Sequence, residues 1–157
     1  TARGPWYGVS WKGNDEKSGG IATNIGIHLF DLLCWLFGQA VECKVHFADP
    51  ARMAGFIEME RARVRWFLST DPGDLPTDAL KSGRRTCRSM TVDGAGVQFG
   101  DGFADLHTRV YEEILAGRGF GIEAVRPAVE LTSRIRHAKV TDGGTERHPR
   151  LQGGARE

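Results

Sequence analysis

Length, composition and charge describe a single globular domain of ordinary make-up. The 157 residues are 40% hydrophobic and 26% charged, which argues against a disordered, collagenous or coiled-coil protein. The net charge of +1 provides no overall field for nucleic acid or an anionic membrane, so we expect neither as a partner. No apolar run approaches the length of a membrane-spanning helix. The chain begins at Thr1 rather than Met, as one domain of a longer polypeptide would.

The first 40 residues are predicted to form a loop followed by an amphipathic helix. Residues 3–17 are polar, aromatic and glycine-rich, and we expect a short strand and a loop there. The segment from residue 21 then places its apolar side chains on one helix face: Ile25, Leu29, Leu32, Leu33 and Leu36. Asn24, His28 and Asp31 share the opposite face. Gly38 stands where a glycine ends a helix.

The middle of the chain is predicted to be an antiparallel sheet. In residues 41–48, Val41, Cys43, Val45 and Phe47 alternate with polar side chains, as in a strand with one buried face. Residues 55–69 predict a hairpin that bends near Arg61, with Glu58 and Glu60 facing Arg63 and Arg65 across the strand pair. Residues 71–76 are a loop, and two further short strands flank Asp93–Gly94. We expect these strands to form one mostly antiparallel sheet, open on one face unless helices cover it.

The last third predicts helices and then a tail. Phe103, Leu106, Val110 and Ile114 recur at helical spacing, and Gly117 follows them. Residues 123–138 form the next predicted helix, in which Pro127 is tolerable only near the first turn. From Thr141 the composition becomes polar and rich in glycine, so we expect a folded domain at 1–140 and a flexible tail at 141–157. The fold class is therefore α+β, with helices packed on one face of the sheet.

Motifs of known chemistry are scarce. No G-x-G-x-x-G follows a strand, and no P-loop, G-x-S-x-G, H-E-x-x-H or C-x-x-C occurs, so a dinucleotide-binding unit is expected outside this chain. The three cysteines are odd in number and lack metal-type spacing, which favours free thiols in the cytoplasm. We expect no metal site, because donors at His28, Asp31 and Cys34 would diverge around a helix.

Asn24 and His28 form the most informative pair. They lie four residues apart on one predicted helix face, directly after Gly19–Gly20, and point two polar groups to one place. A histidine there can accept or donate a proton near neutral pH. The alternative is a core histidine whose ring is hydrogen-bonded to a backbone carbonyl.

The block RGPWYGVSWKGNDEKSGGIATNIGIHLFDLLCWLFG at residues 3–38 resembles the start of the C-terminal domain of the glucose-fructose oxidoreductase/inositol dehydrogenase superfamily (Gfo/Idh/MocA). More narrowly, it is similar to bacterial NAD-dependent dehydrogenases that oxidise the 3-hydroxyl of UDP-N-acetylglucosaminuronic acid in lipopolysaccharide sugar biosynthesis. Residues 51–69, 103–123 and 125–136 support the same subgroup, so the resemblance covers about residues 3–139. Asn24 occupies the position at which most of the superfamily has aspartate, and this variation is typical of the subgroup.

The resemblance implies a mechanism and a set of site residues. A separate N-terminal Rossmann domain would bind NAD and carry the family's catalytic lysine, while His28 helps to hold or accept the hydroxyl proton and Asn24 fixes that hydroxyl. No cofactor-binding residue is assigned within this chain. The UDP-sugar substrate is anionic, so cations must line its path. Lys12 and Arg3 are the candidates, and the alternative for each is a solvated surface charge.

Four further residues are weaker candidates for the substrate site. Tyr7 and Trp11 would border the sugar nucleotide or else pack against the sheet. His107 would reach the nucleotide end of the site or else form a surface pair with Tyr111. Arg126 would contact phosphate or else cap its own helix.

Two other functions remain open from the sequence. One is a non-catalytic binding or assembly module, and the other is a different sugar oxidoreductase of the same superfamily. For either, and for the dehydrogenase, we expect self-association through the open face of the sheet, because members of the superfamily commonly pack this face against another subunit.

Overall fold

The computed structural model describes residues 1–97 and 105–152 and has an α+β architecture, which confirms the predicted fold class. Its centre is an antiparallel sheet of β1 (Ala40–Ala48), β2 (Arg52–Met59) and β3 (Arg63–Ser69), in that order. The strands around Asp93–Gly94 are β4 (Met90–Val92) and β5 (Ala95–Val97), and they form a separate two-stranded sheet. The expected single meander is therefore wrong, and the described strands make two sheets.

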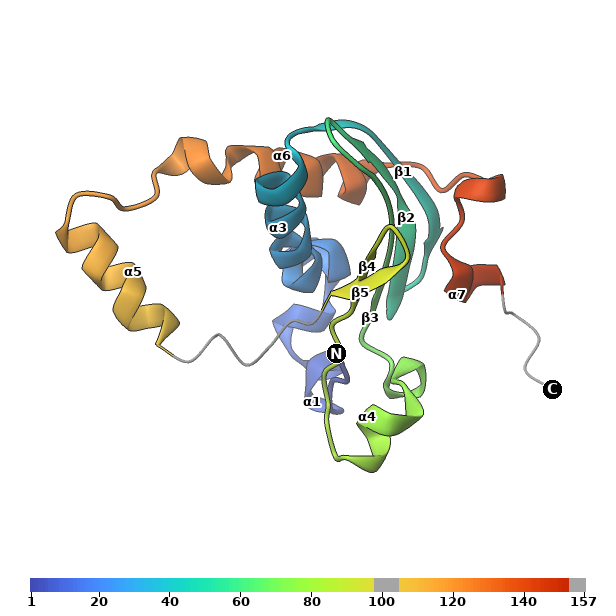
Figure 1. Cartoon of the computed structure of the whole chain (residues 1–157). Coiled ribbons are helices and arrows are strands. Elements are labelled where there is room, and N and C mark those ends of the chain that lie inside the picture. The colour runs from blue at the N-terminus through green and yellow to red at the C-terminus, as the bar shows by residue number, and fades with distance from the viewer. Residues whose placement is uncertain (98–104, 153–157) are drawn as a thin grey trace.

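One face of the central sheet packs against α3 (Ile27–Phe37) and α6 (Ile122–His137), as Figure 1 shows. The fully buried side chains of this core come from all of these elements: Phe30, Leu33, Val45, Ile57, Leu131 and Ile135. Phe30 meets Trp66 edge to face at 5.4 Å between ring centroids, an arrangement favoured by aromatic quadrupoles. Packing of this face, rather than helix propensity alone, holds α3 and α6 in place.

The predicted hairpin is present, with its bend at the expected place. Met59 N donates to Ala62 O at 2.8 Å, and Glu58 pairs with Arg63 across the strands, with Nε and Oε2 at 3.7 Å. The other expected charge pair does not form, because Arg65 faces Phe56 and Glu60 lies in the turn.

Strand β1 departs from strict alternation because its register shifts twice, between Ala40 and Glu42 and between Val45 and Phe47. A bulge moves every following side chain to the other face of a sheet. Phe47 accordingly pairs with Ala54 on the face opposite the helices, while Val41 is 67% exposed. His46, which we expected on the polar side, is buried at the second shift.

The N-terminal segment contains short helices instead of the expected strand. They are α1 (Trp6–Val9), the 3-10 turn η1 (Trp11–Gly13) and α2 (Asp15–Ser18). Asn14 caps α2 by accepting a hydrogen bond from Lys17 N at 3.0 Å, and Gly19 and Gly20 follow with φ of +77° and +70°. This cap and the paired left-handed glycines fix a helical segment where the aromatic residues suggested a strand. The loop after β3 likewise contains η3 (Pro72–Asp74) and α4 (Thr77–Lys81).

Helix α5 (Leu106–Leu115) appears where the spacing predicted it, and Gly117 follows it with φ of +73°. Phe103, the first residue of the predicted helix, lies outside the described residues. Helix α6 begins at Ile122, so Pro127 lies within it rather than in its first turn. Helix α5 buries none of its residues and extends away from the sheet (Figure 1).

Residues 141–152, which we name the C-terminal strap, lie against the sheet face opposite the helices. Residues 153–157 of the predicted tail lie outside the described residues. Val140 pairs with Val45 in a parallel bridge, and Thr141 N donates to Val45 O at 2.9 Å. The strap continues as η4 (Gly144–Glu146) and α7 (Pro149–Gln152) and covers this face (Figure 1). Its contacts are polar and aromatic: Glu146 pairs with Lys44 and Arg63, each at 3.1 Å, and His148 stacks on Phe67. The composition of residues 141–152 did not predict these contacts, because the strap supplies few aliphatic residues.

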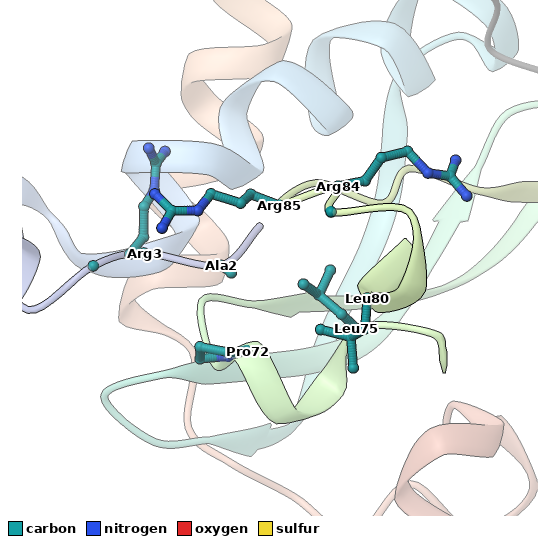
Figure 2. A pocket seen from close by; sticks show the side chains of 9 residues that line it. Ala2, Arg3, Pro72, Leu75, Leu80, Arg84 and Arg85 are labelled. Atoms are coloured by element: carbon teal, nitrogen blue, oxygen red, sulfur yellow. The ribbon is translucent and has the colours of Figure 1, made fainter. Parts of the chain in front are cut away.

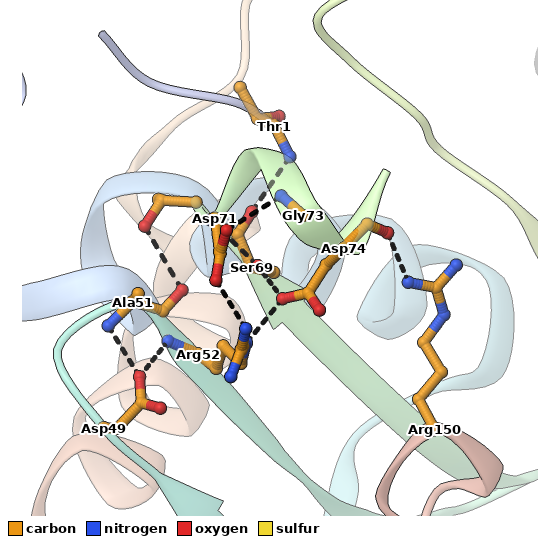
Figure 3. A network of polar contacts seen from close by, with 10 residues as sticks. Thr1, Asp49, Ala51, Arg52, Ser69, Asp71, Gly73, Asp74 and Arg150 are labelled. Atoms are coloured by element: carbon orange, nitrogen blue, oxygen red, sulfur yellow. Dashed lines mark hydrogen bonds and ion pairs between the residues drawn. The ribbon is translucent and has the colours of Figure 1, made fainter. Parts of the chain in front are cut away.

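A second network joins the ends of the strands to the following loop. Arg52 forms ion pairs with Asp71 and, at 2.6 Å, with Asp74, while Ser69 Oγ donates to Asp74 at 2.6 Å (Figure 3). Arg150 of the strap also donates to Asp74 O at 2.6 Å. These contacts fix residues 69–74, and the N-terminal segment binds to this stretch because Arg3 N donates to Thr70 O.

The run of helical turns from Asp15 to Phe37 is, by length and composition, apolar enough to cross a membrane, although the sequence pattern predicted no membrane-spanning helix. The core helix of a globular domain passes the same test, and Phe30 and Leu33 of this run are buried in the core.

Candidate active site

Asn24 lies in a π-helical turn, η2 (Ala22–Gly26), that leads directly into α3. Such turns are rare and are found frequently at functional sites. Asn24 Nδ2 donates to Gly20 O at 3.0 Å and to Lys12 O at 3.2 Å. The amide is therefore held in one orientation, and its Oδ1 accepts no hydrogen bond from the residues that the structure describes. This oxygen is available to accept from a substrate hydroxyl.

His28 follows in the first turn of α3 and is exposed. Its ring makes no hydrogen bond or ion pair within residues 1–97 and 105–152. The alternative interpretation, a buried histidine bonded to a backbone carbonyl, does not describe this side chain. Both ring nitrogens are open to a ligand.

A close approach between helix and sheet positions this part of the chain. A Cβ on Gly26 would lie 2.8 Å from both Leu68 Cδ1 and Phe30 Cε2, so any larger residue would force these buried side chains to shift where η2 approaches β3. We had not singled out Gly26, although the glycine between Asn24 and His28 was visible in the sequence. A glycine inside an otherwise helical pattern is the signal that would have indicated it.

Lys12 and Trp11 are brought next to Asn24 by the backbone rather than by their side chains. The carbonyl of Lys12 accepts from Asn24, while Lys12 Nζ lies 5.7 Å from the centre of the Trp11 ring. Both side chains are exposed. They are free to approach a ligand at the start of η2.

Arg3 and Tyr7 form a second group on the same N-terminal segment. The guanidinium carbon of Arg3 lies 5.7 Å from the centre of the Tyr7 ring, and Trp6 meets Tyr7 edge to face. Burial raises the pKa of Tyr7, and the nearby Arg3 charge partly opposes this shift. Arg3 Nε is buried without a hydrogen-bond partner, an arrangement that an anionic ligand would satisfy.

His107 and Arg126 are not brought into contact with these groups in the described part of the chain. His107 is exposed on α5. Arg126 is held on the surface of α6 by Glu123 at 2.7 Å and Glu130 at 4.0 Å. Among the described residues, no set of three His, Cys, Asp or Glu side chains is grouped to hold a metal ion.

Comparison with known proteins relates the whole arrangement to one family. A family model described as "Oxidoreductase family, C-terminal alpha/beta domain" matches residues 1–94. The WlbA (WbpB) dehydrogenase from Thermus thermophilus, solved in complex with NAD and alpha-ketoglutarate, is 51% identical with a TM-score of 0.90. The same dehydrogenase in complex with NAD and UDP-GlcNAcA is 50% identical with a TM-score of 0.89.

Each match covers 96% of this chain and 49% of the solved chain, so the chain spans about half the length of these dehydrogenases. The resemblance noted in the sequence is confirmed at the level of the family. The chain belongs to this oxidoreductase family and matches its C-terminal alpha/beta domain.

Proposed function

We propose that residues 1–140 form the substrate-binding domain of an NAD-dependent dehydrogenase that oxidises the 3-hydroxyl of UDP-N-acetylglucosaminuronic acid (UDP-GlcNAcA). The observation that carries the proposal is the junction of η2 and α3, where the Asn24 amide is fixed, its Oδ1 accepts no hydrogen bond from the described residues, and His28 four residues later is exposed. The identity of about half the residues to a dehydrogenase solved with NAD and UDP-GlcNAcA supports the choice of substrate.

The chemistry divides between this domain and a second one. In the described residues the sheets are antiparallel, without the parallel βαβ unit that binds dinucleotides, so the nicotinamide belongs on another domain. NAD, when bound, supplies the acceptor for the hydride from C3. As the C3–H bond breaks and the C–O bond becomes a carbonyl, His28 helps to hold or accept the hydroxyl proton beside the catalytic lysine of the other domain. A neutral imidazole is a competent base for this step at cytoplasmic pH.

The remaining candidates have roles in holding the sugar nucleotide. Lys12 and Arg3 bind anionic groups, and Trp11 and Tyr7 border the sugar or base. His107 and Arg126 would contact the nucleotide end of the site, and Arg126 would first have to leave Glu123. The free thiols of Cys34, Cys43 and Cys87 suit a cytoplasmic enzyme, whose place would be in lipopolysaccharide sugar biosynthesis.

We also propose self-association through the sheet, with one change to the expected surface. Cys43, Val45, Trp66 and Leu68 face α3 and α6, so the contact would use the opposite face and the C-terminal strap. The alternative function is a non-catalytic assembly module. The observation that favours it is the apolar side of α5, which has no partner among the described residues.

The test uses a chimera in which this domain replaces its counterpart in the Thermus thermophilus dehydrogenase. We expect NADH formation with UDP-GlcNAcA and none with UDP-N-acetylglucosamine, and no turnover by the 157-residue chain alone. A chimera that binds NAD but does not oxidise UDP-GlcNAcA, when the parent enzyme does, would contradict the proposal. Activity on another sugar nucleotide instead would assign a different oxidoreductase of the family.

A further inference from the structure

A small cavity of about 240 Å³ lies between the N-terminal segment and the loop that follows β3. Figure 2 shows its lining, with Arg3, Arg84 and Arg85 on one side and Pro72, Leu75 and Leu80 on the other. Pockets that hold a whole drug-sized ligand have volumes of roughly 300–1,000 Å³. The cavity therefore suits one part of a larger ligand.

Backbone hydrogen bonds between distant parts of the chain build this cavity. Ala2 N donates to Arg85 O at 2.7 Å, and Arg3 N donates to Thr70 O at 3.3 Å. Residues 69–74 are themselves fixed by the ion pairs of Arg52. Arg3 and Arg85 thus line the same space although they are far apart in the sequence.

The described residues do not balance the charges of Arg3 and Arg85 in the cavity. None of the described residues that line it carries a carboxylate. Arg84 is already engaged, by Asp78 at 3.0 Å and Ser82 at 2.9 Å, whereas Arg85 has no ion pair or side-chain hydrogen bond among the described residues. Arg3 Nε is buried without a partner. Figure 2 shows the Arg85 guanidinium extending toward Arg3 and that of Arg84 extending away.

We propose that this cavity is a subsite for the diphosphate of a nucleotide sugar, with Arg3 and Arg85 as its ligands. This inference rests on the proposed function, because it assigns part of that substrate. Guanidinium groups match phosphate oxygens with paired, charge-assisted hydrogen bonds. The apolar wall of Pro72, Leu75 and Leu80 suits a less polar part of the ligand next to the diphosphate better than it suits the solvated edge of a hexuronate ring.

The cavity is also connected to the candidate active site. Arg3 lies over Tyr7 of α1, and the same segment continues to Lys12, whose carbonyl is bonded by Asn24. One short stretch of chain therefore carries an anion-binding arginine at one end and the contact to Asn24 at the other.

The test is an NMR titration of the ¹⁵N-labelled 157-residue chain with inorganic pyrophosphate, with UDP and with N-acetylglucosaminuronic acid. We expect the first two to shift the amide signals of Ala2, Gly4 and Gly83, which line the cavity. Arg85→Gln should weaken both affinities about 10- to 100-fold, the range for loss of a hydrogen bond between charged groups. Arg84→Gln is the matched control and should change them less than about twofold. The amide spectrum of each variant reports that it is folded.

Three results would overturn the subsite: no response of the wild-type chain to pyrophosphate, an unchanged affinity in Arg85→Gln, or a response to N-acetylglucosaminuronic acid alone. The outcome is separable from that of the proposed function. Arg85-dependent pyrophosphate binding without UDP-GlcNAcA oxidation in the chimera would retain the subsite and reject the dehydrogenase. Oxidation of UDP-GlcNAcA by the Arg85→Gln chimera with an unchanged KM would retain the dehydrogenase and reject the subsite.

Discussion

Helices α5 and α6 follow one another in the chain and both were predicted from the sequence, yet only α6 is packed. Helix α6 buries Ala128, Leu131, Thr132 and Ile135, whereas α5 buries no residue. The apolar side chains of α5 remain exposed: Leu106, Val110, Tyr111, Ile114 and Leu115. An amphipathic pattern thus indicates that a helix has a partner but not where that partner lies. Helix α5 buries no residue against the described part of the chain, and an exposed apolar surface of this kind marks a contact site.

Truncation of one isoleucine in each helix gives the largest expected effect. Ile135 is fully buried in the core, while Ile114 on α5 is 53% exposed. Ile135→Ala should lower the free energy of unfolding by about 2–5 kcal/mol, and Ile114→Ala should change it by less than about 0.5 kcal/mol. Urea denaturation of the 157-residue chain measures both. Equal losses would show that α5 is packed in solution and would remove the contrast.

A glycine pair refines the comparison at the tightest contact of the packed region. A Cβ on Gly26 meets Leu68 and Phe30 at 2.8 Å, whereas a Cβ on Gly96 meets nothing within 4 Å. Gly26→Ala should therefore cost about 1–3 kcal/mol of stability through overpacking, and Gly96→Ala should leave stability unchanged or slightly raised. Thermal melting of the two variants checks this, and a neutral Gly26→Ala would show that α3 has room to move from β3.

The third expected effect is smaller and concerns the pH dependence of stability, to which the packed strap should contribute and the exposed helix α5 should not. His46 is 3% exposed beneath Gly143 of the strap, and neither ring nitrogen has a hydrogen-bond partner in the described part of the chain. Burial lowers its pKa below the ordinary 6.5, with Lys44 and Arg147 acting in the same direction and Glu146 and Asp142 against it. The folded state then binds fewer protons than the unfolded state, so stability should fall as the pH drops below about 6.5.

Urea denaturation at about pH 7.5 and about pH 5.5 measures this loss. His46→Gln should reduce it, leaving the parts due to His148 and the Thr1 amino group, whose pKa values burial also lowers. His107→Gln, on exposed α5, is the control and should leave the pH dependence as it is. A loss of the same size in His46→Gln as in the wild type would exclude His46 as its source.

The sequence was sufficient to predict the fold and the candidate site where the local pattern and the packing agree. Helix α3, the hairpin around Arg61 and the positions of Asn24 and His28 at the start of a helix all follow from periodicity and turn residues. The strap was not predictable, because it is held by Glu146 and His148 through long-range charge and ring contacts that leave no periodic pattern. The cavity at Arg85 could not be predicted for a related reason: it depends on a backbone hydrogen bond between residues 2 and 85, which are far apart in the sequence.

The most direct test of the central claim is the turnover of the chimera with His28→Ala. If His28 takes the hydroxyl proton, kcat should fall about 10²- to 10⁴-fold, with little change in KM or melting temperature, because the exposed ring supports no part of the core. His137→Ala, another exposed histidine on a different helix, should leave kcat unchanged. A kcat within about threefold of the unsubstituted chimera would contradict the catalytic assignment of His28.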